Sequence, residues 1–420
     1  MVIKNIFANY IGTGLVGIVN LVSLAWLSKV YGLENWGIIA ACIALTNFIG
    51  LAEFGISQIY ISEYHKEKQG TSIFRQYQYA ISFMGLFGAV TVIILFCVAA
   101  KYLILEKSIY IFKDISLLIL TLTWAVLSLI NNFYYTNLVA SGYQIRQNIQ
   151  WVSFALIKNT IGLLAGLYIK AIPNIYLLAF IVSTLAEIAL NEFFLKNKTS
   201  KVARFNEMKA VFSKTRFLSV AIALGIASFY CDRVILPLLI SPYEFGVYAI
   251  VVTLGLYFLQ LQYPIIKGIF PLIAKNHHNR EKSDFKMDLP IKFTAVSLVM
   301  APPLLFIGYF SKEVLVWYSI PDKYIYQAQI LLIGILLSVF LNAMYNIIYL
   351  ELVIENKFYT ILAINLTCLI ISSAVLIALG EKNAFIAGAV SWTLVSVIQL
   401  TTGILSRNHE FTDEKHIYRS

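Results

Sequence analysis

The chain contains twelve apolar windows, each long enough to cross a lipid bilayer as an α-helix. A helical span needs about 20 predominantly apolar residues. Lipid cannot satisfy free backbone groups, so windows of this length must be helical, and a β-barrel would show short alternating segments instead. The sequence therefore predicts an all-α membrane protein with about twelve transmembrane helices. The windows are residues 6–29, 37–62, 77–100, 115–140, 150–169, 174–195, 216–240, 244–270, 291–310, 326–350, 358–379 and 384–405.

Composition excludes several classes of protein. Of the 420 residues, 59% are hydrophobic and 13% are charged, whereas a soluble chain has about 25% charged residues. The longest stretch between windows is about 20 residues, which leaves no room for an extramembrane catalytic or nucleotide-binding domain. The four cysteines lie in apolar runs without a CxxC pair, so we expect no metal site and no cofactor. These features argue against an enzyme.

The distribution of cations predicts the orientation. The chain has 32 Lys and Arg against 22 Asp and Glu, a net charge of +10. If the windows alternate in direction, 22 cations fall on the side of the two termini and 8 on the other side. Cytoplasmic loops carry the excess of Lys and Arg, so both termini are predicted to be cytoplasmic. Anionic lipid then explains the positive charge, and nucleic acid is not expected as a partner.

The chain also contains an internal repeat. A shift of 209 residues places Leu33–Ala40 on Pro242–Ala249, and both segments contain aromatic-Gly-x-x-Ala. Two halves of six helices would share one orientation, which is a transporter architecture with a binding cavity between the halves. We therefore predict an N-terminal lobe over residues 1–200 and a C-terminal lobe over residues 216–406. A basic cytoplasmic linker over 201–215 joins them, and a cytoplasmic tail covers 407–420.

Polar residues recur at steps of three and four in four of the windows, which places them on one face of each helix. One interpretation is a hydrated cavity whose tyrosines and amides contact a glycan. The alternative is interhelical hydrogen bonding that holds the bundle together. The residues that we select from these stripes as substrate-binding candidates are Asn131, Tyr135, Tyr263 and Asn342.

Charged residues inside the windows are the sharpest functional candidates, because each costs roughly 2.5–3.5 kcal/mol at mid-membrane. Arg233 offers a planar fork that matches phosphate oxygens, and Asp232 can relay a proton or bind Na⁺. The alternative for both is an ion pair with another helix. Glu53 and Glu187 are candidates either for that partner or for an ion-coupling carboxylate.

Three further cations are predicted at the cytoplasmic ends of their helices: Arg75, Lys158 and Lys267. Together they would form a cationic inner mouth for an anionic substrate. The alternative is that each one extends its side chain to lipid headgroups.

Several short motifs together resemble one family. They are Tyr31-Gly32-Leu33-Glu34-Asn35-Trp36-Gly37, Glu53-Phe54-Gly55-Ile56, Leu138-Val139-Ala140-Ser141-Gly142, Tyr230-Cys231-Asp232-Arg233 and Glu244-Phe245-Gly246-Val247-Tyr248-Ala249. In their order and spacing, over nearly the full length, the chain resembles the O-antigen and capsular polysaccharide repeat-unit flippases. These are polysaccharide transporters of the multidrug/oligosaccharidyl-lipid/polysaccharide exporter superfamily. Glu53 stands where the family often has Asp, a departure that keeps the charge.

The resemblance implies a function. The chain would move undecaprenyl-diphosphate-linked oligosaccharide from the inner to the outer leaflet of a bacterial inner membrane. It would have two six-helix lobes like those of multidrug and toxin extrusion transporters, around a cationic cavity. Alternating access would be driven by a gradient of H⁺ or Na⁺. A polysaccharide polymerase and chain-length proteins are partners that the resemblance alone implies.

Three other functions compete with this one. A multidrug or cation antiporter of the same superfamily would favour cavity carboxylates, and Arg233 argues against it. A membrane-embedded polysaccharide polymerase or glycosyltransferase would need a large outer loop, whereas the longest outer loops here are short and hold no acidic cluster. A channel would need a pore-loop signature, and the chain shows none.

Overall fold

A computed structural model describes residues 2–50, 56–64, 70–102, 114–195, 220–221, 223–260, 262, 289–355 and 357–408. Within these ranges every regular element is a helix, and nine helices are long and apolar enough to span a membrane. The prediction of an all-α membrane protein is confirmed. The predicted spans 115–140 and 358–379 begin and end exactly where two observed helices do, at Ile115–Ala140 and Phe358–Leu379. The elements are α1 (Val2–Gly50), α2 (Ile56–Tyr64), α3 (Gly70–Tyr102), α5 (Ile115–Ala140), α6 (Gln144–Tyr168), α7 (Pro173–Leu195), the 3₁₀ turn η2 (Leu236–Leu238), α9 (Pro242–Gln260), α12 (Leu289–Tyr309), α13 (Ser311–Trp317), α14 (Asp322–Ile354), α15 (Phe358–Leu379) and α16 (Ala384–Asn408).

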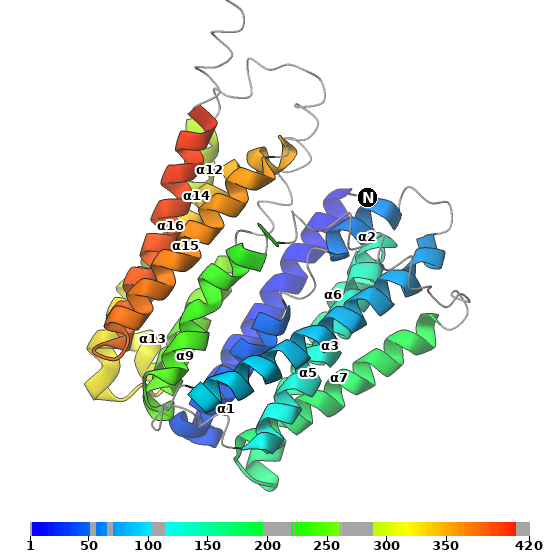
Figure 1. The fold of residues 1–420 in the computed structure, drawn as a ribbon, viewed down its shortest axis with the longest axis horizontal. Helices are drawn as coiled ribbons and strands as arrows, with labels where there is room; N and C mark the ends of the chain where they lie inside the picture. The colour runs from blue at the N-terminus through cyan, green and yellow to red at the C-terminus, as the bar shows by residue number, and fades with distance from the viewer. Residues whose placement is uncertain are drawn as a thin grey trace, which may run out of the picture. The chain divides into compact units, whose positions relative to one another are not determined.

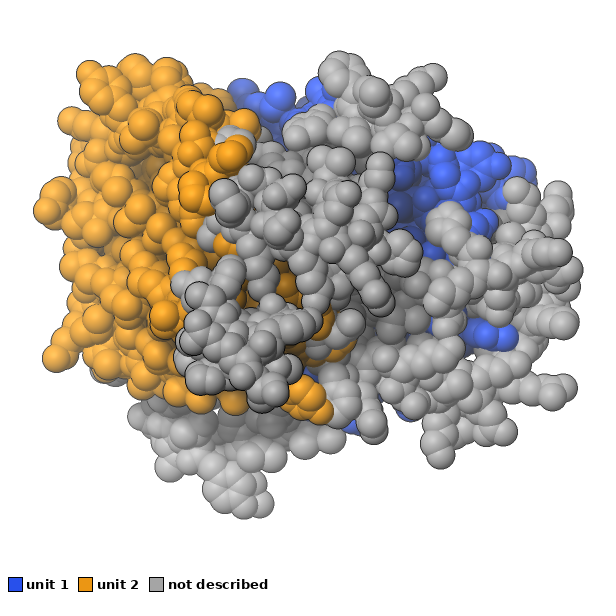
Figure 2. Space-filling model, turned by 90° about the horizontal axis from the view of Figure 1, so that it is seen from above, with its two compact units in different colours: residues 1–223, 237–246 blue, residues 224–236, 247–420 orange. Residues whose placement is uncertain are grey.

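The chain divides into two compact units, which Figure 2 shows in two colours. Unit 1 comprises Met1–Ala223 and Pro237–Gly246, and unit 2 comprises Leu224–Leu236 and Val247–Ser420. The first turns of α9 therefore belong to unit 1, and the rest of that helix belongs to unit 2. The predicted linker 201–215 lies outside the described residues.

The first predicted span, 6–29, and the first part of the second, 37–62, are joined in one element, α1, which is broken at Gly32. Gly32 has φ 74° and ψ 156°, a conformation that residues with a Cβ rarely adopt. The residues around this break bind other helices of unit 1. The Tyr31 hydroxyl donates to the carbonyl of Gly162 at 2.8 Å, and the Asn35 amide donates to the carbonyl of Ala171 at 3.0 Å. The Tyr31–Gly37 motif thus fixes a change of helix direction.

Unit 1 has an aromatic core between α2, α3 and α5. Tyr60, Phe74 and Phe133 are almost fully buried, and the rings of Phe74 and Phe133 stack with centroids 5.2 Å apart. Helices α3, α5 and α7 lie side by side in Figure 1. Asp114 caps α5, because its carboxylate accepts from the backbone N–H of Ser116 at 2.9 Å. This packing sets the positions of the polar groups on α5 and α7.

Unit 2 is built on α14, α15 and α16, with α16 packed against both of the others (Figure 1). Small residues allow a close approach, since a Cβ on Gly334 of α14 would lie 2.8 Å from the Cβ of Ala389 on α16. The residues between α12 and α14 were predicted as a loop and instead contain the short helix α13. This helix has seven residues, Glu313 among them, and was too short and too polar to stand out by hydropathy.

Candidate substrate and ion sites

Four of the predicted site residues meet in unit 1, around the carboxylate of Glu187 on α7. Lys158 of α6 donates to Glu187 Oε2 at 2.6 Å, and the amide of Asn131 on α5 donates to the same oxygen at 2.7 Å. The hydroxyl of Tyr135, one turn further along α5, donates to Glu187 Oε1. Glu187 is fully buried. A charged carboxylate is tolerable in a membrane span only with partners of this kind.

The depth predicted for Lys158 is wrong. It was predicted at the cytoplasmic end of its helix, but α6 runs from Gln144 to Tyr168, so Lys158 lies well inside the helix. The first turns of α6 are polar, with Gln144, Arg146 and Asn148, and hydropathy excluded them from the window. The side chain of Lys158 is 19% exposed and is held by Glu187. Extension to lipid headgroups is therefore not what the structure shows for this residue.

Arg75 lies near the start of α3, as predicted, but it is engaged by a carboxylate that the sequence analysis did not select. Its guanidinium makes a bidentate ion pair with Glu192 of α7, with distances of 2.6 and 2.7 Å. Tyr134 donates to Glu192 as well, and Gln78 donates to the Tyr134 hydroxyl at 2.7 Å. Glu192 lies five residues after Glu187, near the end of the same helix. That position was the only feature of the sequence that could have marked Glu192 as a site residue. An anionic substrate would have to compete with Glu192 for Arg75.

Asp232, in the helical residues 223–235 of unit 2, has hydrogen-bond donors rather than a cation from another helix. Its Oδ2 accepts from the Tyr248 hydroxyl at 2.7 Å and from Trp392 Nε1 at 2.9 Å. Its Oδ1 accepts from the backbone N–H of Arg233 at 2.8 Å. Tyr248 comes from α9 and Trp392 from α16, so one carboxylate joins three segments of unit 2. Nothing in the local sequence pattern singled out Trp392.

Arg233 is buried, with a side chain 8% exposed, yet its donors are only partly used. Its carbon Cζ lies 4.3 Å from the ring centre of Tyr230 and 5.5 Å from that of Trp392. Its Nη2 reaches the Phe229 carbonyl at 3.4 Å, and its Nε lies 3.6 Å from Asp232 Oδ1, beyond hydrogen-bond range. Nε is a buried atom without a hydrogen-bond partner. The guanidinium is thus oriented by aromatic rings and keeps donor capacity.

Asn342 lies in a network of buried amides in unit 2, which favours the interhelical interpretation of its stripe. Gln262 donates to Asn342 Oδ1 at 3.1 Å, and Asn342 donates to Gln399 at 3.1 Å. Asn346 donates to Asn342 Oδ1 at 3.0 Å, and Gln399 donates to Asn365 at 3.3 Å. These bonds connect α14, α15 and α16. The remaining candidates, Glu53, Tyr263 and Lys267, lie outside the described residues.

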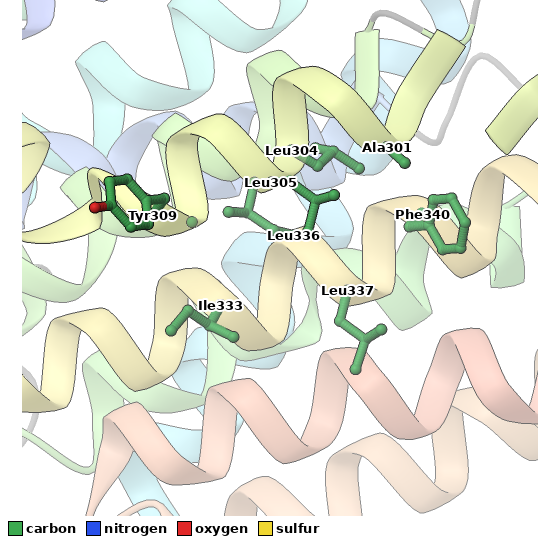
Figure 3. Close-up of a pocket in the computed structure, with 9 residues that line it drawn as sticks. Ala301, Leu304, Leu305, Tyr309, Ile333, Leu336, Leu337 and Phe340 are labelled. Atoms are coloured by element: carbon green, nitrogen blue, oxygen red, sulfur yellow. The ribbon is translucent and has the colours of Figure 1, made fainter. Parts of the chain in front are cut away.

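An apolar groove of about 800 Å³ lies between α12 and α14 in unit 2 (Figure 3). Leu304, Leu305, Leu336 and Phe340 line it, and the Tyr309 hydroxyl is its one polar side-chain group. None of the predicted site residues lines this groove. Its chemistry suits hydrocarbon, which both helices also meet in a bilayer.

Comparisons with known proteins support a transporter fold. The Lipid II flippase MurJ superposes with a TM-score of 0.64 at 15% identity, over 95% of this chain and 87% of MurJ. The MATE multidrug transporter DinF-BH gives 0.65 at 14% identity, over 94% of each chain. A variant of the Vibrio cholerae MATE transporter VcmN gives 0.61 at 13% identity, over 96% of this chain and 95% of VcmN. At these identities the likeness shows the fold, which is the two-lobe fold of these transporters.

No curated protein matches the chain. A family profile described as polysaccharide biosynthesis protein matches residues 2–277, well over half of the chain. The matched segment includes the Tyr31–Gly37 motif, the Glu187 cluster and the Asp232–Arg233 pair. The three solved neighbours are named as two transporters and a flippase. The chain therefore belongs to the polysaccharide biosynthesis protein family, as a multi-pass membrane protein with a transporter fold.

Proposed function

We propose that the chain moves an undecaprenyl-diphosphate-linked oligosaccharide, an O-antigen or capsule repeat unit, across a bacterial inner membrane. The substrate passes from the inner to the outer leaflet by alternating access, coupled to H⁺ or Na⁺. Both termini are cytoplasmic in this proposal, because 21 cations are predicted on their side against 8 on the other once Lys158, which lies within α6, is left out of the original 22. Polymerase and chain-length proteins would act on the product in the outer leaflet.

The observation that carries the proposal is the state of Arg233. A guanidinium in a membrane span is costly, and this one is packed against Tyr230 and Trp392 with its Nε unbonded. Asp232 does not satisfy the free donor of Arg233, because the oxygens of that carboxylate accept from Tyr248, Trp392 and a backbone N–H. A diphosphate offers several acceptor oxygens in the geometry that the arginine fork requires. Arg233 is therefore suited to an anionic headgroup.

The family supports the substrate class. A polysaccharide biosynthesis protein without room for a catalytic domain has transport as its natural task in that process. The MurJ structure with the same fold is named a Lipid II flippase. The bulk of a lipid-linked glycan also explains why a charged lipid headgroup must be recognised inside the membrane.

The first experiment compares leaflets in intact cells. The gene is deleted in its host, and plasmids supply wild type, Arg233→Ala, Arg233→Lys or Arg146→Ala at matched expression. Intact spheroplasts are treated with an impermeant glycosidase that trims only repeat units in the outer leaflet. Arg146 is the control, because it also stacks on an aromatic ring, that of Phe194, but is exposed.

We expect the deletion to remove long-chain surface polysaccharide and to leave lipid-linked repeat units protected from the glycosidase. Wild type and Arg146→Ala restore export, and both Arg233 variants restore at most about a tenth of it, because a lost charge-assisted pair costs about 1.5–3 kcal/mol. Repeat units that accumulate in the accessible leaflet would indicate a polymerase. Normal polysaccharide with altered drug susceptibility would replace the proposal by the multidrug antiporter.

A further inference from the structure

The Glu187 cluster joins one fully buried carboxylate to one accessible cation. The side chain of Glu187 is 0% exposed, whereas that of Lys158 is 19% exposed. The side chain of Lys158 thus offers exposed surface to an anion approaching unit 1, whereas that of Glu187 offers none. The Lys158 ammonium has three N–H donors, and the hydrogen bond that the structure gives it is the one to Glu187. Lys158 is positioned to exchange one anionic partner for another.

If the ion pair with Lys158 broke, Glu187 would be a buried carboxylate without a compensating charge. The carboxylate would keep the Asn131 amide and the Tyr135 hydroxyl but would lose the one cation that pairs with it among the described residues. A buried carboxylate without a compensating charge is strongly disfavoured in a low-dielectric site, and uptake of a proton removes the charge. Exchange of the partner of Lys158 is thereby linked to protonation of Glu187.

Asn131 can serve Glu187 in both protonation states. Its Nδ2 donates to the carboxylate at 2.7 Å, while its Oδ1 is buried and without a hydrogen-bond partner. A protonated carboxyl group carries an O–H that needs an acceptor, and a rotation of the Asn131 amide supplies one. The unused Oδ1 is costly in the ion-paired state and becomes useful in the neutral one. The cluster is thus equipped for two states rather than one.

Several other charged or titratable groups on α7 and on the helices around it have partners of their own. On α7 itself, Glu192 is paired with Arg75 of α3, and Tyr134 of α5 bonds to Glu192. Tyr31 of α1 bonds to a backbone carbonyl, and Arg146 of α6 lies over the ring of Phe194. In the part of the chain that the structure describes, the groups bonded to Glu187 are Lys158, Tyr135 and Asn131. A tyrosine and an amide do not titrate in the neutral range, so the proton goes to Glu187.

We infer that Lys158 is a phosphate site held closed by Glu187, and that a phosphate or diphosphate opens it as Glu187 takes up one proton. The exchange balances: the ammonium keeps its three protons and its charge, the anion replaces the carboxylate, and one H⁺ from solution neutralises Glu187. This inference rests on the proposed function only for the source of the anion. It supplies what that function lacks, a physical link between substrate binding and a proton.

The test uses purified full-length protein, with inorganic pyrophosphate as probe. Binding is measured by calorimetry in two buffers of different ionisation enthalpy, which reports the number of protons taken up. The variants are Glu187→Gln, Lys158→Gln and the double variant, each checked for thermal unfolding. Glu351→Gln is the matched control, because Glu351 is also buried and ion-paired, with Arg407 at 2.9 Å in unit 2.

We expect wild type and Glu351→Gln to take up about one proton for each pyrophosphate bound. Glu187→Gln should bind about tenfold more tightly and without proton uptake, because loss of a competitor worth 1.4 kcal/mol is a factor of ten. Lys158→Gln and the double variant should lose the proton-linked binding, and any pyrophosphate held by Arg233 alone should bind without proton uptake. The inference is overturned if folded Glu187→Gln binds no more tightly than wild type, or if proton uptake persists in it.

Farnesyl diphosphate separates the two sources of anion. If farnesyl diphosphate binds more tightly than pyrophosphate, the site is assigned to a lipid headgroup. If the two bind equally tightly, the site is assigned to a free anion, and this result also supports the exchange at Lys158. The outcome is independent of the export assay. If gene deletion removes polysaccharide but Glu187→Gln leaves pyrophosphate binding and proton uptake unchanged, the proton-linked exchange at Lys158 is rejected and the flippase function stands. If deletion leaves polysaccharide unchanged but Glu187→Gln abolishes proton uptake, the exchange stands and the flippase function is rejected.

Discussion

Gly37 and Gly246 pack backbone against backbone in unit 1, at positions 209 residues apart. A Cβ on Gly37 would overlap the carbonyl oxygen of Pro242, and a Cβ on Gly246 would overlap that of Leu33. Pro242 is itself 209 residues from Leu33, so the contact is reciprocal under the repeat seen in the sequence. The aromatic-Gly motif therefore recurs because two copies of it cross without side chains between them.

This crossing predicts that alanine is too large at either glycine. Gly37→Ala and Gly246→Ala should each lower the midpoint of thermal unfolding by several degrees and reduce the yield of folded protein, because an added methyl meets backbone atoms that cannot rotate away. Gly17→Ala is the control on the same helix, since a Cβ there meets nothing within 4 Å. Equal midpoints for all three variants in fluorescence-detected unfolding would contradict the crossing.

The Lys158–Glu187 pair predicts non-additive stability. Lys158→Met alone leaves a buried carboxylate without a cation and should cost about 3–5 kcal/mol, as removal of one partner of a buried pair does. Adding Glu187→Gln removes that charge and should recover most of the loss. Denaturant titration in detergent micelles measures both. A double variant no more stable than Lys158→Met would show that the pair is not coupled.

The hydrogen bond from Tyr248 to Asp232 predicts a second stability effect. Tyr248→Phe removes the hydroxyl that donates to Asp232 at 2.7 Å and should cost about 1.5–3 kcal/mol, the range for a hydrogen bond to a charged group. Tyr359→Phe is a suitable reference, because that tyrosine is largely exposed. The two variants are compared in the same unfolding assay, and a matching loss in both would argue against a role for Tyr248 in holding the carboxylate.

The amide network predicts that Asn342 acts on stability more than on substrate. Interhelical hydrogen bonds in membranes average about 0.6 kcal/mol, and Asn342 bonds to Gln262, Gln399 and Asn346. Asn342→Ala should therefore lose roughly 1–2 kcal/mol, while export at matched folded protein stays within about twofold. A cycle with Gln399→Ala should show coupling. A large export defect in an Asn342→Ala variant of unchanged stability would instead support a role for Asn342 in binding substrate.

The charge bias predicts the orientation of the chain. A reporter that is active only outside the cytoplasm should be inactive when fused after Ser420 and active when inserted beside Asp114. The insertion point is chosen because Asp114 precedes α5 and caps it. The reverse pattern would invert the topology, and with it the direction of transport in the proposed function.

How much the sequence predicted differs from helix to helix. The ends of α5 and α15 were exact, because an apolar run bounded by polar residues is a local signal. The start of α6 was missed, because polar residues such as Arg146 and Asn148 continue the helix beyond the hydrophobic stretch. The window 150–169 therefore began six residues too late.

The sequence by itself determined the class of protein, the helical spans and the presence of costly charges within them, because bilayer thickness and insertion energy act on each segment separately. Only the tertiary structure decided which charges meet. Lys158 and Glu187 lie 29 residues apart, and Asp232 and Trp392 lie 160 apart. Such pairings follow from how helices pack, which depends on small residues, kinks such as Gly32 and buried hydrogen bonds, and no periodicity within one segment encodes them.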